Sequence, residues 1–286
     1  MSSTNEEVFK NWSESAGFWD KHREARRVMF GPLTPALCRE AGVPDAPPSS
    51  SYRLLDVASG PGDATLDIAD TLGSNATIWC TDLVPDMVRI AERTAGERGV
   101  KNVQFRVTGG ESLPFDSNFF DSVVCRFGIM FFTDPVAGVR EALRVLKTGR
   151  RFAYCVWGAR AVNPFHRVIQ DVLDRYVPAP EPDTDAPGAY RYALPGKLAA
   201  ILREAGAADI RDHLFQFKIE APISFDQFFE VRTEMSDSLR DKLRKMPADQ
   251  KSSFKEDVSK EAKPYFTQNG FRFPAEVRLV SGSCAK

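Results

Sequence analysis

The stretch with the clearest capacity for chemistry runs Leu54-Leu55-Asp56-Val57-Ala58-Ser59-Gly60-Pro61-Gly62-Asp63. An apolar run ends in an acid, passes through small residues and two glycines, and leads into a helical pattern. Because glycine has no Cβ, such a turn lets backbone N–H groups approach a ligand closely. The residues predicted to line this ligand are Asp56, Ala58, Ser59, Gly60, Pro61 and Gly62. The sequence thus predicts a strand, a tight turn and a helix that bind a nucleotide-like cofactor.

A second acid lies at the spacing that such a site requires. Asp82 ends the next apolar run, 20 residues after Gly62. An acid at about this offset is placed to bind the two hydroxyls of a ribose, and the carboxylate makes these hydrogen bonds charge-assisted. Leu83 and Met87 follow it and are expected to contact the adenine through apolar atoms.

The charge of the turn indicates which cofactor it binds. A dinucleotide site uses G-x-G-x-x-G and leaves the helix N-terminus free for a pyrophosphate. Here Asp63 stands at the start of the helix, where a carboxylate would repel a diphosphate, and Asp56 adds the same bias. Both favour a ligand with an amine and no phosphate, and S-adenosylmethionine has these properties. Dinucleotide binding and a cofactor-free structural turn are the alternatives.

Three further motifs follow the turn: Asp82-Leu83-Val84-Pro85-Asp86-Met87, Glu111-Ser112-Leu113-Pro114-Phe115-Asp116 with Phe120-Asp121, and Arg144-Val145-Leu146-Lys147-Thr148-Gly149-Arg150. With these motifs the segment 54–157, a little over a third of the chain, resembles a class I S-adenosylmethionine-dependent methyltransferase. It most resembles the small-molecule group that includes the ubiquinone/menaquinone-biosynthesis methyltransferases. The resemblance implies an α/β fold with a Rossmann-like, seven-stranded, mostly parallel sheet and helices on both faces. It also implies an enzyme that transfers a methyl group from S-adenosylmethionine.

One position departs from the family pattern. The acid that usually contacts the adenine amine is replaced by Gly109. We therefore expect the backbone of Gly110 and Glu111, or another side chain, to hold the adenine. Alternatively, Glu111 caps the turn that follows it.

The fourth predicted strand ends in Arg126-Phe127-Gly128-Ile129-Met130-Phe131-Phe132 and, by fold position, faces both cofactor and acceptor. Arg126 is the one charged residue in an apolar stretch, and a buried charge needs a partner. Structural pairing is expected, with an acid or carbonyl near the cofactor or an acidic group on the substrate as the candidate partners, and Phe127 is predicted to lie beside the cofactor with Arg126. Met130 and Phe131 are predicted to line the acceptor pocket, and Trp19 is predicted to cover it from an N-terminal helix.

Methyl transfer is an in-line displacement at carbon, so the protein acts chiefly by alignment of the reacting atoms. A general base is optional. The candidates are His22, His166, Tyr190 and Tyr192, and His166, just after the fifth predicted strand, is the best placed. The acceptor is expected to be a small and fairly apolar molecule. The alternatives are a non-catalytic protein that binds S-adenosylmethionine and a dinucleotide-dependent oxidoreductase.

The composition narrows the choice of partners. The chain has 286 residues, of which 43% are hydrophobic and 27% charged, with a formal net charge of −1. Without a basic excess a nucleic-acid partner has little electrostatic support. No apolar run approaches the roughly 18–20 residues that span a bilayer, so no membrane partner is expected. The five cysteines are scattered without a Cys/His cluster, so no metal site is indicated and the reducing cytoplasm is the expected location. A homodimer is left open.

The pattern divides the chain into N-terminal helices and a linker over 1–50, a cofactor-binding core over 51–221 and 269–286, and a helical insertion over 222–268 before the last strand. The insertion is expected to act as a substrate lid, and a solvated appendage or dimer contact is the alternative. Strands are predicted over 52–58, 76–81, 103–108, 121–127, 151–157, 209–219 and 271–281. Helices are predicted over 5–30, 33–41, 63–72, 85–96, 135–146, 165–176 and 195–205.

Overall fold

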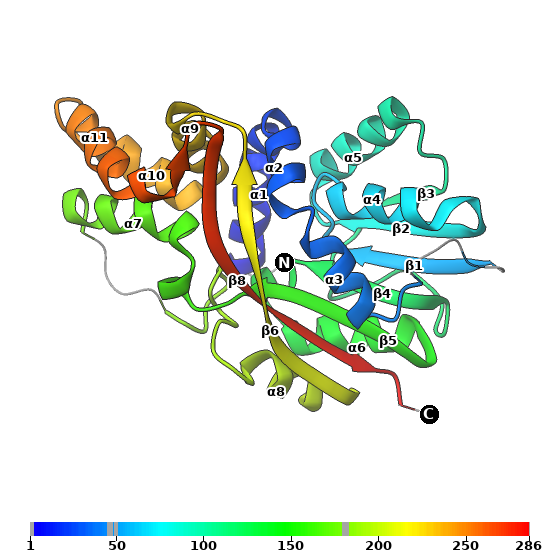
Figure 1. The fold of residues 1–286 in the computed structure, drawn as a ribbon. Helices are drawn as coiled ribbons and strands as arrows, with labels where there is room; N and C mark the ends of the chain where they lie inside the picture. Colours follow the sequence, from blue (N-terminus) through cyan, green and yellow to red (C-terminus); the bar gives the residue numbers. More distant parts are fainter. Residues whose placement is uncertain (1–2, 45–47, 49–50, 179–182, 286) are drawn as a thin grey trace.

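A computed structural model describes residues 3–44, 48, 51–178 and 183–285. One sheet runs through it in the order β3-β2-β1-β4-β5-β8-β6, and a short β7 pairs with β8 (Figure 1). The neighbours from β3 to β5 are parallel, and β8 runs antiparallel to both β5 and β6. The strands are β1 (Tyr52–Val57), β2 (Ala76–Asp82), β3 (Val103–Val107), β4 (Phe120–Arg126), β5 (Leu146–Trp157), β6 (Ala208–Ala221), β7 (Phe266–Thr267) and β8 (Gly270–Ser283).

The predicted Rossmann-like, mostly parallel sheet is therefore confirmed. The described sheet has eight strands instead of seven, because the two residues of β7 add a short pair to β8. The fifth strand also begins earlier than expected, at Leu146, where it pairs with Phe120 before a bulge shifts the register. The motif from Arg144 to Arg150 thus enters the sheet directly from a helix.

Helices cover both faces of the sheet. In Figure 1, α4 (Asp63–Leu72) and α5 (Pro85–Arg98) lie above the sheet, α3 (Leu33–Glu40) lies in front of β5, and α6 (Pro135–Val145) and α8 (Lys197–Glu204) lie below. Because they are covered on both faces, the central strands are apolar in their middles. Leu54, Leu55, Val123 and Val124 have no exposed surface. This packing brings the carboxyl ends of β1, β2, β4 and β5 to one edge, where parallel α/β sheets bind ligands.

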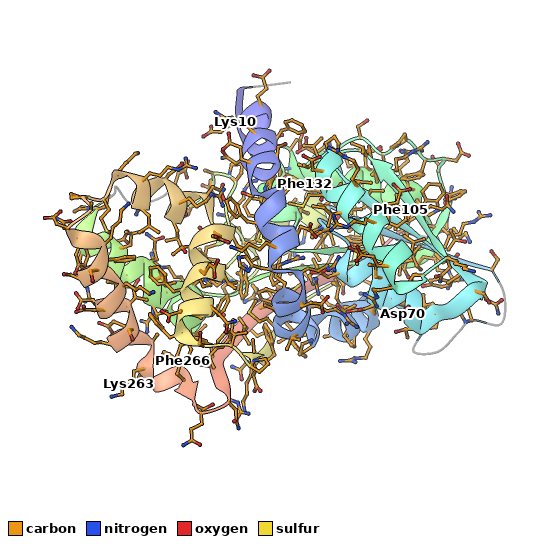
Figure 2. All side chains as sticks on the ribbon, turned by 90° about the horizontal axis from the view of Figure 1, so that it is seen from above. Lys10, Asp70, Phe105, Phe132, Lys263 and Phe266 are labelled. Atoms are coloured by element: carbon orange, nitrogen blue, oxygen red, sulfur yellow. The ribbon has the colours of Figure 1, made fainter. Side chains whose placement is uncertain are left out.

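The N-terminal region differs from the single helix predicted over 5–30. It forms α1 (Ser3–Lys21) and α2 (Arg23–Phe30), which meet at a bend where His22 has φ −100° and ψ 19°. The bend has a tertiary cause. Ala16 of α1 packs on α5, whereas Arg26 of α2 reaches the start of α4. Viewed from above, α1 lies between the two halves of the molecule (Figure 2).

The insertion contains α9 (Phe225–Met235), α10 (Asp237–Lys245) and α11 (Gln250–Ala262). It starts at a capping box, in which Ser224 Oγ accepts a hydrogen bond from Gln227 N and Ser224 N donates to the Gln227 side chain. It packs beside α7 (Pro164–Tyr176) at the end of the sheet away from β3 (Figure 1). Phe228, Phe254 and Val258 are fully buried and belong to the same hydrophobic core as the sheet.

The segments 42–51 and 178–188 are rich in proline and polar residues, a composition that predicts a linker and a loop, and parts of both lie outside the described residues. Among the residues that the structure describes, no helix has the length and apolar character needed to cross a lipid bilayer.

Candidate active site

The turn after β1 has a backbone that its sequence makes possible. Gly60 and Gly62 have φ values of +56° and +83°, and Ala58 has φ +52°, which is costly for a residue with a side chain. A Cβ on Gly62 would lie 2.8 Å from the Cβ of Ala91 on α5, so the turn and this helix are in close contact. Ser59 closes the turn from the other side, because its N–H donates to Thr81 O at 2.9 Å.

Asp82, at the carboxyl end of β2, faces this turn. Its Oδ2 accepts a hydrogen bond from Gly60 N at 2.8 Å and its Oδ1 accepts one from Val84 N at 2.9 Å. Burial raises the pKa of Asp82 and these N–H groups oppose the rise. Each carboxylate oxygen keeps a second lone pair. A half-buried acceptor is therefore held beside the glycine turn, where a ribose diol would donate to it.

Asp56, at the carboxyl end of β1, is incompletely paired. Only 1% of its surface is exposed. Its Oδ2 accepts a hydrogen bond from Thr65 Oγ1 at 2.6 Å, but its Oδ1 is buried and has no hydrogen-bond partner among the described residues. Burial raises its pKa to about 6. Because a buried acceptor without a donor is unfavourable, the site suits a ligand that carries an ammonium group.

Asp63 does not play the part predicted from the sequence. Its Oδ2 lies 2.7 Å from Nη1 of Arg26 and 3.9 Å from Nη2 of Arg126. Asp63 and Arg26 are both buried, so the negative charge at the start of α4 is offset by an internal cation. The prediction that Asp63 repels phosphate and attracts an amine is wrong, because α2 supplies a guanidinium. Of Asp56 and Asp63, only Asp56 still favours a ligand that has an amine and no phosphate.

Arg126 has the structural pairing that was expected for it. Its Nη1 donates to Phe30 O at 3.2 Å and to Thr34 Oγ1 at 3.0 Å. These contacts tie the end of β4 to the end of α2 and the start of α3. Arg126 therefore shapes the site chiefly by holding the N-terminal helices in place.

In the loop after β3, the contacts of Glu111 support the alternative prediction that this residue caps a turn. Its carboxylate accepts hydrogen bonds from Thr133 Oγ1 at 3.0 Å and Asp134 N at 2.9 Å, just before α6. A Cβ on Gly110 would lie 2.4 Å from the ring of Phe132, so this glycine is required for packing. Side-chain contact with the adenine by Glu111 is therefore disfavoured, and its backbone remains available as a predicted contact.

Helix α1 covers the predicted adenine end of the site. Met87 is buried with Ala16 of α1, Val84 and Ile90, whereas Leu83 is partly exposed. A Cβ on Gly109 would lie 3.5 Å from Cδ1 of Leu83, so these two residues are neighbours.

Trp12 joins two residues predicted to line the acceptor pocket. Its ring lies 5.4 Å from that of Trp19 and 5.0 Å from that of Phe131, in both cases edge to face. The third predicted residue, Met130, is 2% exposed and packs into the main core. Met130 therefore supports the wall of the predicted acceptor pocket from the core side.

Charged groups attach α1 to the insertion. Lys21 Nζ lies 2.5 Å from Glu230 Oε1 and 2.9 Å from Glu234 Oε2, and His22 Nε2 lies 2.7 Å from Glu234 Oε2. Arg240 Nη2 donates to Ser15 Oγ at 2.8 Å. Helices α1, α9 and α10 thus form one assembly over the site, here called the cover.

An aromatic wall lies at the carboxyl ends of β4 and β5. Phe127 and Trp157 stack with ring centroids 4.5 Å apart and planes inclined by 10°. Phe127 adopts φ +63°, a second strained backbone beside Ala58. The His166 ring lies 4.3 Å from that of Trp157, and its Nε2 is buried without a hydrogen-bond partner in the described chain. His166 therefore lies just after β5 and packs against this aromatic wall, of which Trp157 is only 4% exposed.

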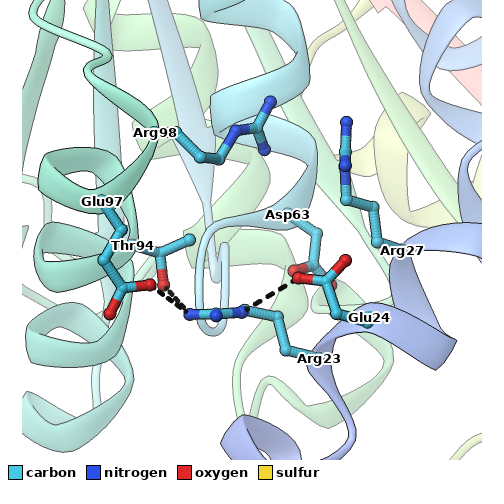
Figure 3. Close-up of a pocket in the computed structure, with 7 residues that line it drawn as sticks. All are labelled: Arg23, Glu24, Arg27, Asp63, Thr94, Glu97 and Arg98. Carbon is cyan, nitrogen blue, oxygen red and sulfur yellow. Dashed lines mark hydrogen bonds and ion pairs between the residues drawn. The ribbon is translucent and has the colours of Figure 1, made fainter.

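A small cavity of about 80 Å³ lies beside Asp63 between α2, α4 and α5 (Figure 3). Arg23 crosses it to Glu97, at 3.1 Å, and to Thr94 Oγ1, at 2.8 Å. Arg98 points to Asp67, at 3.0 Å. The cavity is smaller than the roughly 300 Å³ that a small-molecule site needs, and its cations are already paired.

Sequence reasoning missed three residues near the site. They are Arg26, which pairs with Asp63, Trp157, which stacks on Phe127, and Arg232, whose Nη2 lies 3.5 Å from Nδ1 of His166. Arg26 and Arg232 are buried cations on short amphipathic helices. A basic residue within an apolar helical face, as in Phe228-Phe229-Glu230-Val231-Arg232, was a usable signal. Trp157 was identified only as the end of a strand.

Comparisons with known proteins agree with this geometry. Residues 42–177 match the model of the ubiE/COQ5 methyltransferase family. The ubiquinone/menaquinone biosynthesis C-methyltransferase UbiE of Shewanella woodyi is 31% identical over 125 residues, 43% of this chain and 48% of that protein. This chain spans about half the length of the first curated relatives that it matches.

Two solved structures share the fold. YcgJ from Bacillus subtilis has a TM-score of 0.55 and 20% identity, with 90% of this chain and 98% of that one covered. The phosphoethanolamine N-methyltransferase 2 of Haemonchus contortus, solved with S-adenosyl-L-methionine, has a TM-score of 0.54 and 16% identity, with coverage of 93% and 57%. The resemblance predicted from the motifs is confirmed: residues 42–177 of this chain match the ubiE/COQ5 methyltransferase family.

Proposed function

We propose that this protein is an S-adenosylmethionine-dependent methyltransferase that acts on a small, fairly apolar acceptor by in-line methyl transfer. The observation that carries the proposal is the pair of acids around the glycine turn. Asp82 accepts a hydrogen bond from Gly60 N and can accept further ones, and Asp56 has a buried oxygen that no donor reaches among the described residues. The first suits a ribose diol and the second suits an ammonium group. The family match and the relatives' names as methyltransferases support the same activity.

Each residue of the site has a proposed role in binding the cofactor or the acceptor. Asp82 would accept the ribose hydroxyls, Asp56 the amino group of the methionine tail, and the turn at Gly60 and Gly62 would bring the backbone close to the cofactor. When bound, S-adenosylmethionine supplies a methyl group on a sulfonium. Phe127 and Trp157 would hold the acceptor in line with this group and exclude water, which favours a reaction that neutralises charge.

We further propose that the cover acts as the substrate lid, with 1–50 and 222–268 as its two parts around a core of 51–221 and 269–286. The ion pair between Lys21 and Glu230 and the hydrogen bond between His22 and Glu234 support it. Hydrogen exchange should slow in 222–268 when cofactor and acceptor are bound, and unchanged exchange would contradict the lid.

A cytoplasmic location is proposed because the buried thiols of Cys80, Cys125 and Cys155 suit a reducing compartment.

Calorimetry with S-adenosylhomocysteine and with NAD⁺ tests the cofactor. We expect binding of the first and none of the second. Methyl transfer from labelled S-adenosylmethionine to a metabolite panel then tests catalysis. Binding without transfer to any acceptor would favour a non-catalytic S-adenosylmethionine-binding protein, and binding of NAD⁺ alone would favour an oxidoreductase.

The raised pKa of Asp56 predicts how cofactor affinity depends on pH. Only the carboxylate form pairs with an ammonium group, and burial raises the pKa of Asp56 to about 6. Affinity for S-adenosylhomocysteine should therefore increase about tenfold from pH 5 to pH 7. Asp56→Asn should flatten this dependence. A wild-type affinity that stays constant over this range would contradict the assignment of Asp56 to the amino group.

A further inference from the structure

His166, Tyr190 and Arg232 form a buried polar cluster at the acceptor end of the site, here called the donor cluster. They come from three separate segments: α7, the irregular segment before α8, and α9 of the insertion. The rings of His166 and Tyr190 are 5.9 Å apart, and Nη2 of Arg232 lies 3.5 Å from Nδ1 of His166. The cluster adjoins the aromatic wall through the 4.3 Å contact between His166 and Trp157.

The neighbours of His166 determine which of its nitrogens carries the proton. Burial, then the charges of Arg232 and Arg160, lower its pKa well below the usual value, so the ring is neutral at physiological pH. A guanidinium has only N–H groups to offer, so the nitrogen that faces it, Nδ1, must present its lone pair. The proton therefore resides on Nε2. That atom is buried and has no partner among the described residues, so it is an unused donor.

Tyr190 and Arg232 add further donor capacity. The Tyr190 hydroxyl is buried without a partner in the described chain, and burial raises its pKa, so it keeps its proton. Arg232 is 8% exposed, and its recorded polar contacts are Phe165 O at 3.2 Å and His166 Nδ1. Its guanidinium also lies over the ring of Phe165, with Cζ 4.7 Å from the ring centroid, and no carboxylate of the described chain pairs with it. A buried cation without a counter-ion is strongly unfavourable.

We propose that the donor cluster is the binding site for the carboxylate of a flat, apolar acceptor. This rests on the proposed function. The hydrogen-bond donors of His166 and Tyr190 and the positive charge of Arg232 complement an anion with two acceptor oxygens, and the Trp157–Phe127 stack complements the flat body attached to it. A carboxylate is charged at neutral pH without help from the protein. In this role His166 is a hydrogen-bond donor that orients the acceptor, and it is not the general base.

The test compares 2-naphthoate with 2-naphthamide, which have the same flat ring system and differ in charge. Binding of each to the full chain is measured by calorimetry, with and without saturating S-adenosylhomocysteine. We expect the carboxylate to bind at least about tenfold more tightly than the amide. Equal affinities would overturn the proposal. If S-adenosylhomocysteine does not bind but the discrimination is present, the proposed function fails and the carboxylate site stands.

Variants identify the atoms responsible. Tyr190→Phe removes one hydroxyl and should weaken naphthoate about tenfold while naphthamide changes little. Tyr176→Phe is the matched control, because the Tyr176 hydroxyl donates to Asp257 of α11 and is not part of the donor cluster. His166→Gln keeps an N–H near the position of Nε2 and should retain most of the preference, whereas His166→Leu should lose it. A Tyr190→Phe variant that discriminates as well as the wild type would overturn the assignment.

Discussion

Asp82→Ala should weaken binding of S-adenosylhomocysteine by more than about 100-fold, because it removes the acceptor of two charge-assisted hydrogen bonds worth about 1.5–3 kcal/mol each. The substitution also frees Gly60 N and Val84 N, which Asp82 binds at 2.8 and 2.9 Å. The turn then loses its fixed shape as well as its acceptor. Calorimetric titration of the folded variant measures the loss directly.

Two further variants make this result specific. Asp82→Asn keeps an oxygen in place but removes the charge, so its affinity should fall between those of the wild type and Asp82→Ala. Asp116→Ala removes an exposed acid from the same half of the chain and should bind normally. An Asp82→Ala protein with unimpaired affinity would remove the basis for placing an adenosine at this turn.

Arg26→Met should lower the free energy of unfolding by about 3 kcal/mol, at the lower end of the range for a broken buried ion pair. Arg26 is 2% exposed and Asp63 is 5% exposed, so the substitution leaves a buried carboxylate without its main partner. The loss is at the lower end because Arg126 remains 3.9 Å from Asp63. Urea denaturation of the intact chain, followed by circular dichroism, measures the change.

The double variant Arg26→Met/Asp63→Asn provides the control for this prediction. With both charges removed, nothing charged is left unpaired, so most of the lost stability should return. If the double variant is as unstable as Arg26→Met, the damage comes from lost packing around α2 and the charge argument is wrong. Asp63→Asn alone should also destabilise the fold, because it leaves Arg26 buried and unpaired.

Sequence reasoning succeeded where the signal was local. The run from Leu54 to Asp63 defines a strand, a turn and a helix by itself, since apolar continuity, glycines and helical periodicity all lie within ten residues. The structure places Asp82 beside Gly60 because adjacent parallel strands end at the same edge. The fold class followed from the same alternation of strands and helices.

Sequence reasoning failed where the partner of a residue is distant from it along the chain. Asp63 seemed to be a free anion because Arg26 lies 37 residues before it on another helix. The bend at His22 could not be predicted, since the residues around it have a continuous helical pattern and only tertiary contacts distinguish α1 from α2. His166 was singled out from its place after the fifth predicted strand, but the direction of its hydrogen bonding depends on Arg232, 66 residues later.

The two sides of α1 respond differently to ionic strength. Its contacts with α5 combine the apolar cluster of Ala16, Met87 and Ile90 with an ion pair between Asp20 and Arg93. Its contacts with α9 are polar, through the ion pairs of Lys21 and the hydrogen bond of His22 to Glu234. Salt screens the ion pairs and leaves the apolar contacts intact. Raised ionic strength should therefore loosen α1 from α9 more than from α5, where the apolar cluster remains.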